Sequence, residues 1–465
     1  VVDCAEREEG FLMDQVTGQL AEFSLGIDCD RISDEVRHAL KRHAIDSVGC
    51  ALGAFDETPA QIARQIALIC GGPSSCGVIG TSQRTSPDLA AFANGTMIRA
   101  LDFNDTYPGG HPSDGLGAIF ALAQAAGAEG ARVLAASFIL YEVFGALCDA
   151  VDFRERGWDQ GTVLQIALAC AAAPLLGLDL QKTANAIALA ACDGPATRQS
   201  RAGRLSMWKG CAAPSAARNA VFLTQLAAAG LSGPDRAFDG RHGFFEQVSG
   251  GAFEPRLGDP CDASPAIKRT LLKFLPIETN IQSAANAALA LRKELCLEDI
   301  AAIRIETFWR SWHETGSEPA KWAPDSRETA DHSMPFIVAT ILRDGGVSLD
   351  SFARDRLVDA SLRAIMEKIT IEHNPAFTAE YPEKMTTRIE VTARCGRSNH
   401  AIIDHPKGHV ANPLTDDDVE AKFKSLAEQR LTKAGADELL AWLWRLEDQV
   451  SVDPLFVMAA KSRPC

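Results

Sequence analysis

The sequence predicts a mainly α-helical protein, in which a large all-helical domain carries a smaller α+β lid domain. Alanine- and leucine-rich tracts dominate the chain up to Gly230, and alanine at helix contacts lets helices pack closely. After Pro260, several short segments alternate apolar and polar residues with a period of two, which is typical of strands. A chain of 465 residues is also too long for one ordinary core.

The lid is expected to interrupt the helical domain. We place the first part of the helical domain at residues 12–262, the α+β lid domain at residues 263–405 and the return to the helical domain at residues 406–460. The return is predicted because the pattern is helical again from Asp416 onward. No internal repeat of ~20–50 residues is present, which argues against a solenoid.

The helices of the first domain are predicted from their caps and their apolar spacing. The first starts at Ser33, a favourable N-cap, and runs over residues 33–55 with an apolar residue at every fourth position from Val36 to Leu52. Pro87 is suited to the first position of the helix at 89–101. Further helices are expected at residues 59–70 (ended by Gly71-Gly72-Pro73), 116–127, 131–150, 162–176, 181–192 and 214–230.

The lid is predicted from a change in pattern. Strands are expected at residues 268–274, 300–308 and 387–394, where β-branched residues alternate with polar ones. Helices are expected at residues 280–294, 333–343 and 350–369, and these would cover the sheet.

The composition narrows the class of function. The formal net charge of −15 argues against nucleic acid and against an anionic membrane surface, since both need clustered Lys and Arg. The most apolar run, residues 163–178, contains Pro174 and is too short for a span of ~20 residues. The acidic N-terminal stretch has no apolar h-region, and 13 irregularly spaced cysteines suggest a reducing compartment, so we expect a cytoplasmic protein.

No cofactor or metal is expected. The chain has no Cys-x-x-Cys pair for an iron–sulfur cluster, and Pro-Lys-Gly interrupts the helical spacing of His405 and His409. There is neither a Gly-x-Gly-x-x-Gly after a strand nor a Walker-type Gly-Lys-Ser/Thr, which disfavours a nucleotide-dependent enzyme.

Ionisable residues concentrate in one interruption of the helical tracts, between Arg99 and Gly115. Two prolines and two glycines prevent this segment from being one helix, so a loop holds its polar side chains. These side chains belong to Asp102, Asp105, Thr106, His111, Ser113 and Asp114. Carboxylates are common in turns, so Asp102 and Asp105 are also open to a turn-capping role and His111 to satisfying backbone carbonyls. Asp105 and Asp114 stay open between the two readings.

Leu-Asp-Phe-Asn-Asp-Thr, a short spacer and His-Pro-Ser-Asp resemble the signature of the MmgE/PrpD family, which includes 2-methylcitrate dehydratase, cis-aconitate decarboxylase and iminodisuccinate epimerase. The resemblance continues through Ser206-Met-Trp-Lys-Gly-Cys-Ala-Ala, Lys273-Phe-Leu-Pro-Ile-Glu, Ala330-Asp-His-Ser-Met-Pro and Pro406-Lys-Gly-His-Val-Ala-Asn-Pro-Leu-Thr. It implies a di- or tricarboxylate as small-molecule substrate, a helical domain with an inserted lid, and a homodimer.

The resemblance also implies roles for particular residues. Catalytic roles fall to Asp102, His111, Lys209 and Lys273, and substrate-binding roles to Thr106, Gln160, Asn280 and His332. Imidazole titrates near neutral pH, so His111 is the candidate proton donor or acceptor, while Asp102 would orient it or act as base. Lys209 and Lys273 would neutralise carboxylates. The alternatives are a lysine lying over Trp208, an edge-strand charge at Lys273 and a helix N-terminal box at His332.

Two positions depart from the dehydratases of the family. Gln160 and Asn280 stand where the family pattern has histidines, and amides bind oxygen but cannot transfer protons at neutral pH. The leading hypothesis is a cofactor-independent lyase that eliminates water from a citrate-like polycarboxylate. A decarboxylase or an epimerase of a related di- or tricarboxylate, and a non-catalytic carboxylate-binding member, remain the alternatives.

Overall fold

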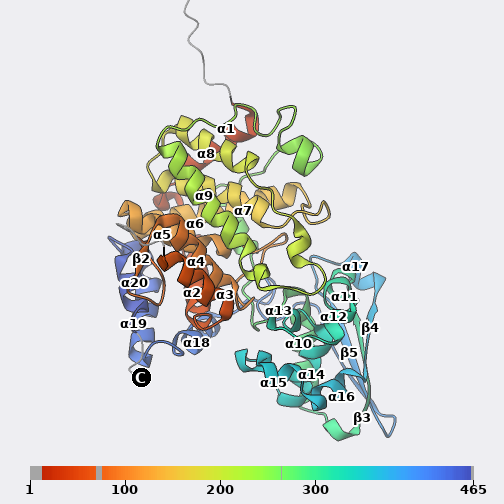
Figure 1. Ribbon diagram of the computed structural model, residues 1–465. Helices are drawn as coiled ribbons and strands as arrows, with labels where there is room; N and C mark the ends of the chain where they lie inside the picture. Colours follow the sequence, from red (N-terminus) through yellow and green to blue (C-terminus); the bar gives the residue numbers. More distant parts are fainter. Residues whose placement is uncertain (1–12, 70–75, 263, 462–465) are drawn as a thin grey trace, which may run out of the picture.

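The structure is a computed structural model that describes residues 13–69, 76–262 and 264–461 (Figure 1). A large helical part and a smaller α+β part lie side by side, which confirms the predicted fold class. Each has its own hydrophobic core: one core gathers residues from 16 to 272 and from 414 to 459, and the other gathers residues from 275 to 391. The exact domain boundaries stay a prediction.

The large part is built from segments on both sides of the lid. Its helices before the lid are α1 (Gln15–Gly26), α2 (Asp34–Gly53), α3 (Thr58–Ile69), α4 (Pro87–Arg99), α5 (Leu116–Ala126), α6 (Gly130–Ala150), α7 (Gly161–Leu175), α8 (Leu180–Cys192) and α9 (Ala212–Ala228). Its helices after the lid are α18 (Asp416–Ala427), α19 (Lys433–Trp444) and α20 (Asp453–Ala459). In Figure 1 these last helices lie beside α2 to α5, and α18 packs on α2.

The sequence signals explain these helices. The side chain of Ser33 accepts a hydrogen bond from Val36 N and begins α2, and Pro87 is the first residue of α4. α7, rich in buried alanine, packs on α6, α8 and α9. α6 is long and apolar enough to cross a membrane, but 83% of its apolar window is buried, as in a core helix. α3 ends at Ile69, and its predicted end at Cys70 and Gly71-Gly72-Pro73 lies outside the described residues.

A four-stranded sheet forms the lid, in the order β4-β3-β5-β6. Its strands are β3 (Ile300–Thr307), β4 (Ile369–His373), β5 (Thr387–Ala393) and β6 (Ser398–Ile403), and only the β3–β4 pair is parallel. The helices of the lid are α10 (Gln282–Arg292), α11 (Trp309–Thr315), α12 (Pro319–Trp322), α13 (Arg327–Ala330), α14 (Met334–Asp344), α15 (Arg354–Leu357), α16 (Ala360–Met366) and α17 (Pro375–Ala379). α10 packs on β5, β6 and α14. A short hairpin of β1 (Cys76–Gly77) and β2 (Arg84–Thr85) lies in the helical part.

Two predictions for the lid were wrong. Residues 268–274 are not a strand: a 3-10 helix (Ala266–Arg269) is followed by a single bridge between Leu271 and Thr106, because this backbone pairs with a loop of the helical part and not with the sheet. Residues 350–369 are not one helix. Asp359 is extended there and caps α16 by accepting from Ser361 N, and the segment ends in the strand β4, which was not predicted.

Candidate active site

The chain turns sharply at Asp102, directly after α4, and begins the Asp102 loop (residues 100–111). Its φ is +50°, and among the described residues no other non-glycine residue has a positive φ. Aspartate tolerates this left-handed conformation better than most residues. The turn directs the carboxylate of Asp102 back towards Arg99, with which it forms a hydrogen-bonded ion pair.

The rest of the loop is fixed by backbone pairing. Thr106 and Leu271 exchange two hydrogen bonds of 2.9 Å, and Tyr107 and Gly110 exchange two of 2.8 and 2.9 Å. The loop then enters a 3-10 helix (Pro112–Gly115) and α5. It therefore joins the helical part directly to the segment that carries Lys273.

Buried polar contacts hold the loop from below. The carboxylate of Asp105 accepts hydrogen bonds from Tyr141 Oη at 2.6 Å and Ser113 Oγ at 2.6 Å, and lies 2.9 Å from His43 Nδ1. Asp114 accepts from Asn104 at 2.9 Å. The carboxylates of Asp105 and Asp114 are fully buried, and they support the loop from beneath.

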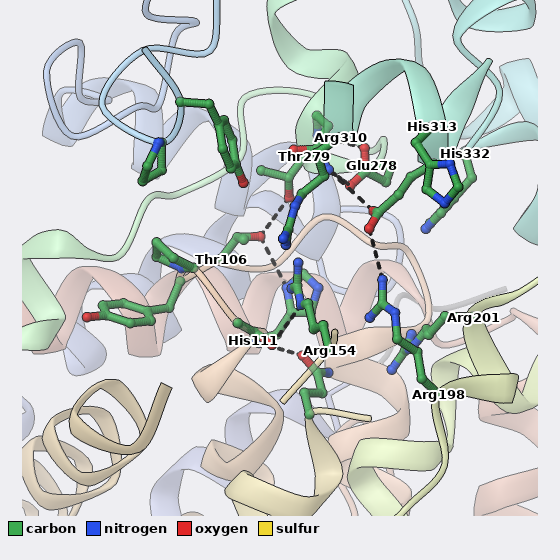
Figure 2. Close-up of a pocket in the computed structure, with 18 of the residues that line it drawn as sticks. Thr106, His111, Arg154, Arg198, Arg201, Glu278, Thr279, Arg310, His313 and His332 are labelled. Atoms are coloured by element: carbon green, nitrogen blue, oxygen red, sulfur yellow. Dashed lines mark hydrogen bonds and ion pairs between the residues drawn. The ribbon is translucent and has the colours of Figure 1, made fainter. Parts of the chain in front are cut away.

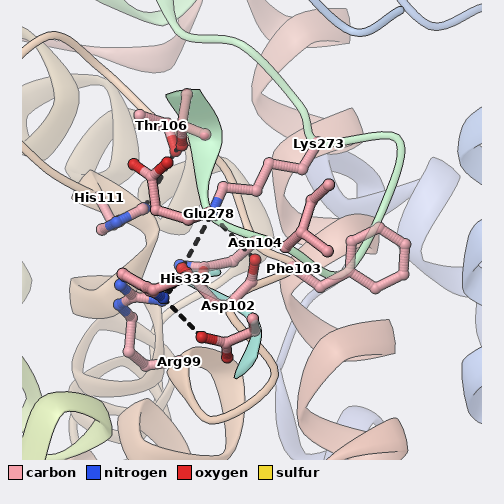
Figure 3. A network of polar contacts seen from close by, with 12 residues as sticks. Arg99, Asp102, Phe103, Asn104, Thr106, His111, Lys273, Glu278 and His332 are labelled. Atoms are coloured by element: carbon pink, nitrogen blue, oxygen red, sulfur yellow. Dashed lines mark hydrogen bonds and ion pairs between the residues drawn. The ribbon is translucent and has the colours of Figure 1, made fainter. Parts of the chain in front are cut away.

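The carboxylate of Asp102 is the centre of a buried ion cluster, drawn in part in Figure 3. Lys273 Nζ donates to Asp102 Oδ1 at 2.8 Å and to the Asp102 carbonyl oxygen at 2.9 Å. Lys209 Nζ lies 3.4 Å from Asp102 Oδ2 and donates to both carboxylate oxygens of Asp331 at 3.0 Å. Burial raises the pKa of Asp102, but Arg99, Lys209 and Lys273 outweigh burial and hold that pKa well below its usual range.

His111 is held as a neutral imidazole. Its Nδ1 lies 2.5 Å from the Asp105 carbonyl oxygen, which can only accept, so Nδ1 carries the hydrogen. Burial first, and then the charges of Arg99 and Lys273, lower the pKa of His111 well below its usual value. The unprotonated Nε2 is therefore available as a base at neutral pH.

A cavity of about 990 Å³ lies between the two cores. Figure 2 shows Thr279, Glu278, Arg310, His313 and His332 of the lid facing His111, Arg154, Arg198 and Arg201 of the helical part. The predicted site residues in its lining are Asp102, Thr106, His111, Gln160, Lys273, Asn280 and His332. Lys209 is not among the residues that line the cavity, and its ammonium group donates to both carboxylate oxygens of Asp331. Contact of Lys209 with substrate stays a prediction.

Gln160 and Asn280, the two amides that stand where the family pattern has histidines, form hydrogen bonds with other groups of the protein. Gln160 Oε1 accepts from the backbone N of His111 at 2.8 Å, and Gln160 Nε2 donates to Asp114 at 2.8 Å. Asn280 Nδ2 donates to Glu278 Oε1 at 2.7 Å. Gln160 thus supports the backbone of His111, and Asn280 orients a carboxyl group.

His332 and Thr106 complete the predicted set. His332 Nδ1 lies 2.5 Å from Asp331 Oδ1, and burial, followed by the charge of Lys209, lowers the pKa of His332 to about 4. Thr106 Oγ1 lies 2.9 Å from Thr279 Oγ1 and 3.2 Å from His111 Nδ1. Thr106 therefore links His111 of the helical part to Thr279 of the lid.

Comparison with known proteins decides the family. The MmgE/PrpD N-terminal domain matches residues 18–256, and the MmgE/PrpD C-terminal domain matches residues 275–447. The chain belongs to the MmgE/PrpD family. The 2-methylcitrate dehydratase of Salmonella typhimurium is 30% identical over 390 residues, which are 78% of this chain and 80% of the relative.

Two further relatives carry two different activities. The 2-methylcitrate dehydratase of Escherichia coli K12 is 30% identical over 404 residues, 81% of this chain and 83% of the relative. The cis-aconitate decarboxylase of Mus musculus is 26% identical over 459 residues, 94% of this chain and 92% of the relative. At family level the MmgE/PrpD protein is a lyase-type enzyme with a small-molecule substrate.

Sequence reasoning missed one carboxyl group of this MmgE/PrpD site. Glu278 is buried in the cavity lining, and burial, followed by the charge of Glu314, raises the pKa of Glu278 to about 7. The signal was its position directly beside the cavity residues Thr279 and Asn280. Arg154, Arg198 and Arg310 were also missed as cavity residues, and isolated arginines give no sequence signal.

One group of side chains in the MmgE/PrpD site has metal-ligand chemistry. Ligand atoms of Asp102, Asp331 and His332 lie within 4.8 Å of one another. Lys209 bonds or approaches all three residues, and Lys273 bonds Asp102. Ammonium groups thus occupy the positions in which a metal ion would balance the two carboxylates, and this donor set does not fit a divalent cation.

Proposed function

We propose that the protein is a cofactor-independent hydro-lyase that eliminates water from a citrate-like polycarboxylate. One observation carries the proposal: a neutral imidazole and a buried carboxyl group with a raised pKa line the same cavity. Eliminating water from a β-hydroxy acid needs a base for the carbon-bound proton and an acid for the departing hydroxyl group. His111 and Glu278 supply this pair.

His111 acts as the base in this proposal. Its Nε2 lone pair removes the proton from the carbon next to a substrate carboxylate, and the electron pair of that C–H bond forms the new double bond. Lys273 uses two of its three donors on Asp102, which leaves one N–H to hold the reacting carboxylate. The positive charge there stabilises the negative charge that develops on the carboxylate.

Glu278 acts as the acid. With a pKa of about 7, a large fraction of its carboxyl groups is protonated at neutral pH. It transfers this proton to the leaving hydroxyl group as the C–O bond breaks, and water departs. Release of the His111 proton to solvent and uptake of one proton by Glu278 restore the starting state.

Proton NMR in D₂O tests the reaction type. Purified protein, treated with a chelator, is incubated with 2-methylcitrate, citrate, cis-aconitate and iminodisuccinate. Loss of water from one of the hydroxy acids supports the proposal. Loss of CO₂, or uptake of deuterium without net change, would replace it with decarboxylation or epimerisation.

A parallel incubation with His111→Ala identifies the base. We expect this substitution to lower the rate by about 10²- to 10⁴-fold, since it removes the proton acceptor. If the wild-type protein converts none of these compounds but one of them raises its melting temperature, the protein is a non-catalytic carboxylate-binding member of the family.

Three properties belong to the same proposal. Activity after chelation would support metal independence, for which the lysines around Asp102 argue. The homodimer and the cytoplasmic location follow from the family resemblance and from the cysteine content, respectively. Their tests are light scattering and fractionation of cells that produce the protein.

A further inference from the structure

Three arginines of the cavity lining, Arg154, Arg198 and Arg310, act on the carboxylate of Glu314. Arg198 Nη2 lies 2.9 Å from Glu314 Oε1, and Arg310 Nη2 lies 3.4 Å from Asp152 Oδ2. Figure 2 shows Arg154 and Arg198 facing Arg310 across the cavity. Arg154 and Arg198 come from the helical part and Arg310 from α11 of the lid, so the group spans both parts.

Arg154 has an open guanidinium fork. Its Nε donates to the Gly109 carbonyl oxygen at 3.2 Å, which fixes the side chain against the Asp102 loop. Within residues 13–69, 76–262 and 264–461, neither of its Nη groups has a hydrogen bond or ion pair. The residue lines the cavity, so both Nη groups are available to a ligand there.

Positive charge exceeds negative charge in this group. The three guanidinium groups face the carboxylates of Glu314 and Asp152. The other acids of the cavity lining are balanced elsewhere or exposed: Asp149 pairs with Arg269, Asp159 pairs with Arg201, Glu318 acts on Lys321, and Glu155 and Glu383 are exposed to solvent. Glu278, with its pKa raised to about 7, carries only part of a negative charge at neutral pH. Burial raises the pKa of Glu314, but the three arginines outweigh burial and lower it. Burial and the charge of Arg154 lower the pKa of Arg198, as expected where two cations face each other. An anion in the cavity would balance the excess.

We propose that Arg154, assisted by Arg198 and Arg310, binds a second substrate carboxylate, distinct from the one that reacts at Lys273. The planar fork of arginine matches a carboxylate with two parallel hydrogen bonds. Glu314 holds the arginines in place when this carboxylate is absent. The inference rests on the proposed function for the reacting end, and it assigns the substrate to acids that carry a further carboxylate beyond the reacting one.

Calorimetric titration with two unreactive probes tests the assignment. Tricarballylate has three carboxylates, and butyrate is the same molecule with the central and one terminal carboxylate replaced by hydrogen. We expect the wild-type protein to bind tricarballylate more tightly. Arg154→Gln should weaken tricarballylate binding by about 10- to 100-fold, since one charge-assisted contact is lost. It should change butyrate binding by less than about threefold, since the single carboxylate of butyrate binds at Lys273.

Control variants separate binding from folding. Arg156→Gln, in an exposed arginine two residues further on that contacts Val248 and not the cavity, should leave both affinities unchanged. Arg154→Lys should lose less affinity than Arg154→Gln, because charge remains without the fork. Arg198→Gln is a second variant that should show the same selective loss, and melting curves verify that each variant is folded.

The outcomes distinguish this site from the proposed reaction. An equal loss for both probes in Arg154→Gln, equal wild-type affinities, or no binding of either probe would overturn the second-carboxylate site. Arg154-dependent binding of tricarballylate without turnover of any substrate would keep the site and remove the lyase reaction. Turnover of a substrate by the wild-type protein, together with unchanged tricarballylate binding by Arg154→Gln, would keep the lyase reaction and overturn the second-carboxylate site.

Discussion

Asp102 sets the charges of the site, while the proposed proton transfers are assigned to His111 and Glu278. The carboxylate oxygens of Asp102 are engaged by Arg99, Lys209 and Lys273, whose charges hold its pKa well below the usual range. Nδ1 of His111 is oriented by the carbonyl oxygen of Asp105 instead. Asp102 therefore neutralises the cations that hold the floor of the cavity.

Asp102→Asn should destabilise the protein strongly. The amide fits the same space but leaves three buried cations short of one negative charge, and we expect the free energy of unfolding to fall by about 3–5 kcal/mol. Because the folded-state pKa of Asp102 is depressed, its stabilisation is complete above about pH 4 and is lost as pH falls below that. Urea unfolding at pH 7 and at pH 3 measures both effects.

An exposed aspartate provides the control for this experiment. Asp34, whose side chain is 93% exposed, pairs with Arg37 at the surface. Asp34→Asn should change the free energy of unfolding by less than about 1 kcal/mol. An Asp102→Asn protein as stable as Asp34→Asn would show that the cluster carries no net stabilisation.

The pH profile should report the protonation of Glu278. In the proposed mechanism the acid form of Glu278 is needed, and this form is lost as pH rises through the pKa of about 7, so kcat/KM should fall above neutral pH. On the acid side, the depressed pKa of His111 keeps the base neutral to well below pH 6.5. Glu278→Gln should lower kcat/KM by about 10²- to 10⁴-fold and abolish the alkaline fall.

Glu314→Gln is the companion variant for Glu278. The charge of Glu314 raises the pKa of Glu278, so its removal should shift the alkaline fall to lower pH. An alkaline limb that persists in Glu278→Gln would assign that titration to another group.

At the residue scale, the structure brings the predicted residues of the Asp102 loop to the cavity, and the roles of these residues stay predictions. His111 and Thr106 line the cavity as expected, because a loop between two long helices has few other places to go. The raised pKa of Glu278 could not be predicted, since it depends on burial and on the charge of Glu314, 36 positions away. The same holds for the contacts of Gln160, whose partners His111 and Asp114 become neighbours only in the fold.

At the scale of elements, α18 returns to α2 and reaches the site through one lysine. Lys422 Nζ lies 2.6 Å from Asp46 Oδ1 and donates to the carbonyl oxygens of Phe103 at 2.6 Å and Lys273 at 2.9 Å. Phe103 directly follows Asp102 in the chain, and Lys273 is itself a member of the ion cluster. The helix thereby fixes the two segments that carry Asp102 and Lys273.

Lys422→Met should lower both stability and activity, through two different effects. Asp46 would be left as an unpaired buried carboxylate, which costs about 3–5 kcal/mol of unfolding free energy. The double variant Lys422→Met/Asp46→Leu should recover most of this stability, because an apolar pair can replace a buried ion pair. Its kcat should remain about 10- to 100-fold low, since the two carbonyl oxygens are no longer held. Full recovery of kcat would contradict this positioning role.

The contact of α4 with α5 depends on glycine. A Cβ atom at Gly117 would lie 2.6 Å from the backbone nitrogen of Gly95. Gly117→Ala should therefore destabilise the protein by about 1–3 kcal/mol in chemical unfolding. Gly26→Ala is the control: nothing lies within 4 Å of that Cβ, and the alanine should be neutral or stabilising by up to about 1 kcal/mol. Equal stability of the two variants would argue against close packing here.

Long helices were predictable because their signals are local. Caps, prolines and apolar spacing specify α2 and α4 to within two residues. The errors fall where tertiary contacts decide the backbone. Arg343 of α14 binds Asp359 at 2.5 Å and helps to hold the break before α16, and no local pattern shows this.

For the whole molecule, the cavity depends on how the two cores meet. The Thr106–Thr279 contact joins residues 173 positions apart, and Arg198–Glu314 joins residues 116 apart. The family resemblance predicted a helical domain with a lid, but these pairings come only from the structure. The net charge of −15 makes the local excess of arginine necessary for an anionic ligand.

The predicted homodimer is a property of the whole molecule. We expect light scattering at micromolar concentration to give twice the mass of the 49.8 kDa chain. A mass that stays at that of one chain over the micromolar range would refute the prediction. The calorimetric titrations should be repeated at the same concentrations, so that binding and assembly are compared in one state.

The position of Lys422 has a consequence for biosynthesis. A ribosome that has translated the chain as far as residue 400 has made Asp102, His111 and Lys273, but not Lys422, which holds two of the segments that bear them. The helical core also stays open on one side until α18 emerges and packs on α2. The nascent chain therefore lacks the lysine that fixes both segments of the ion cluster until α18 is made, and we expect activity to begin only after translation has passed α18.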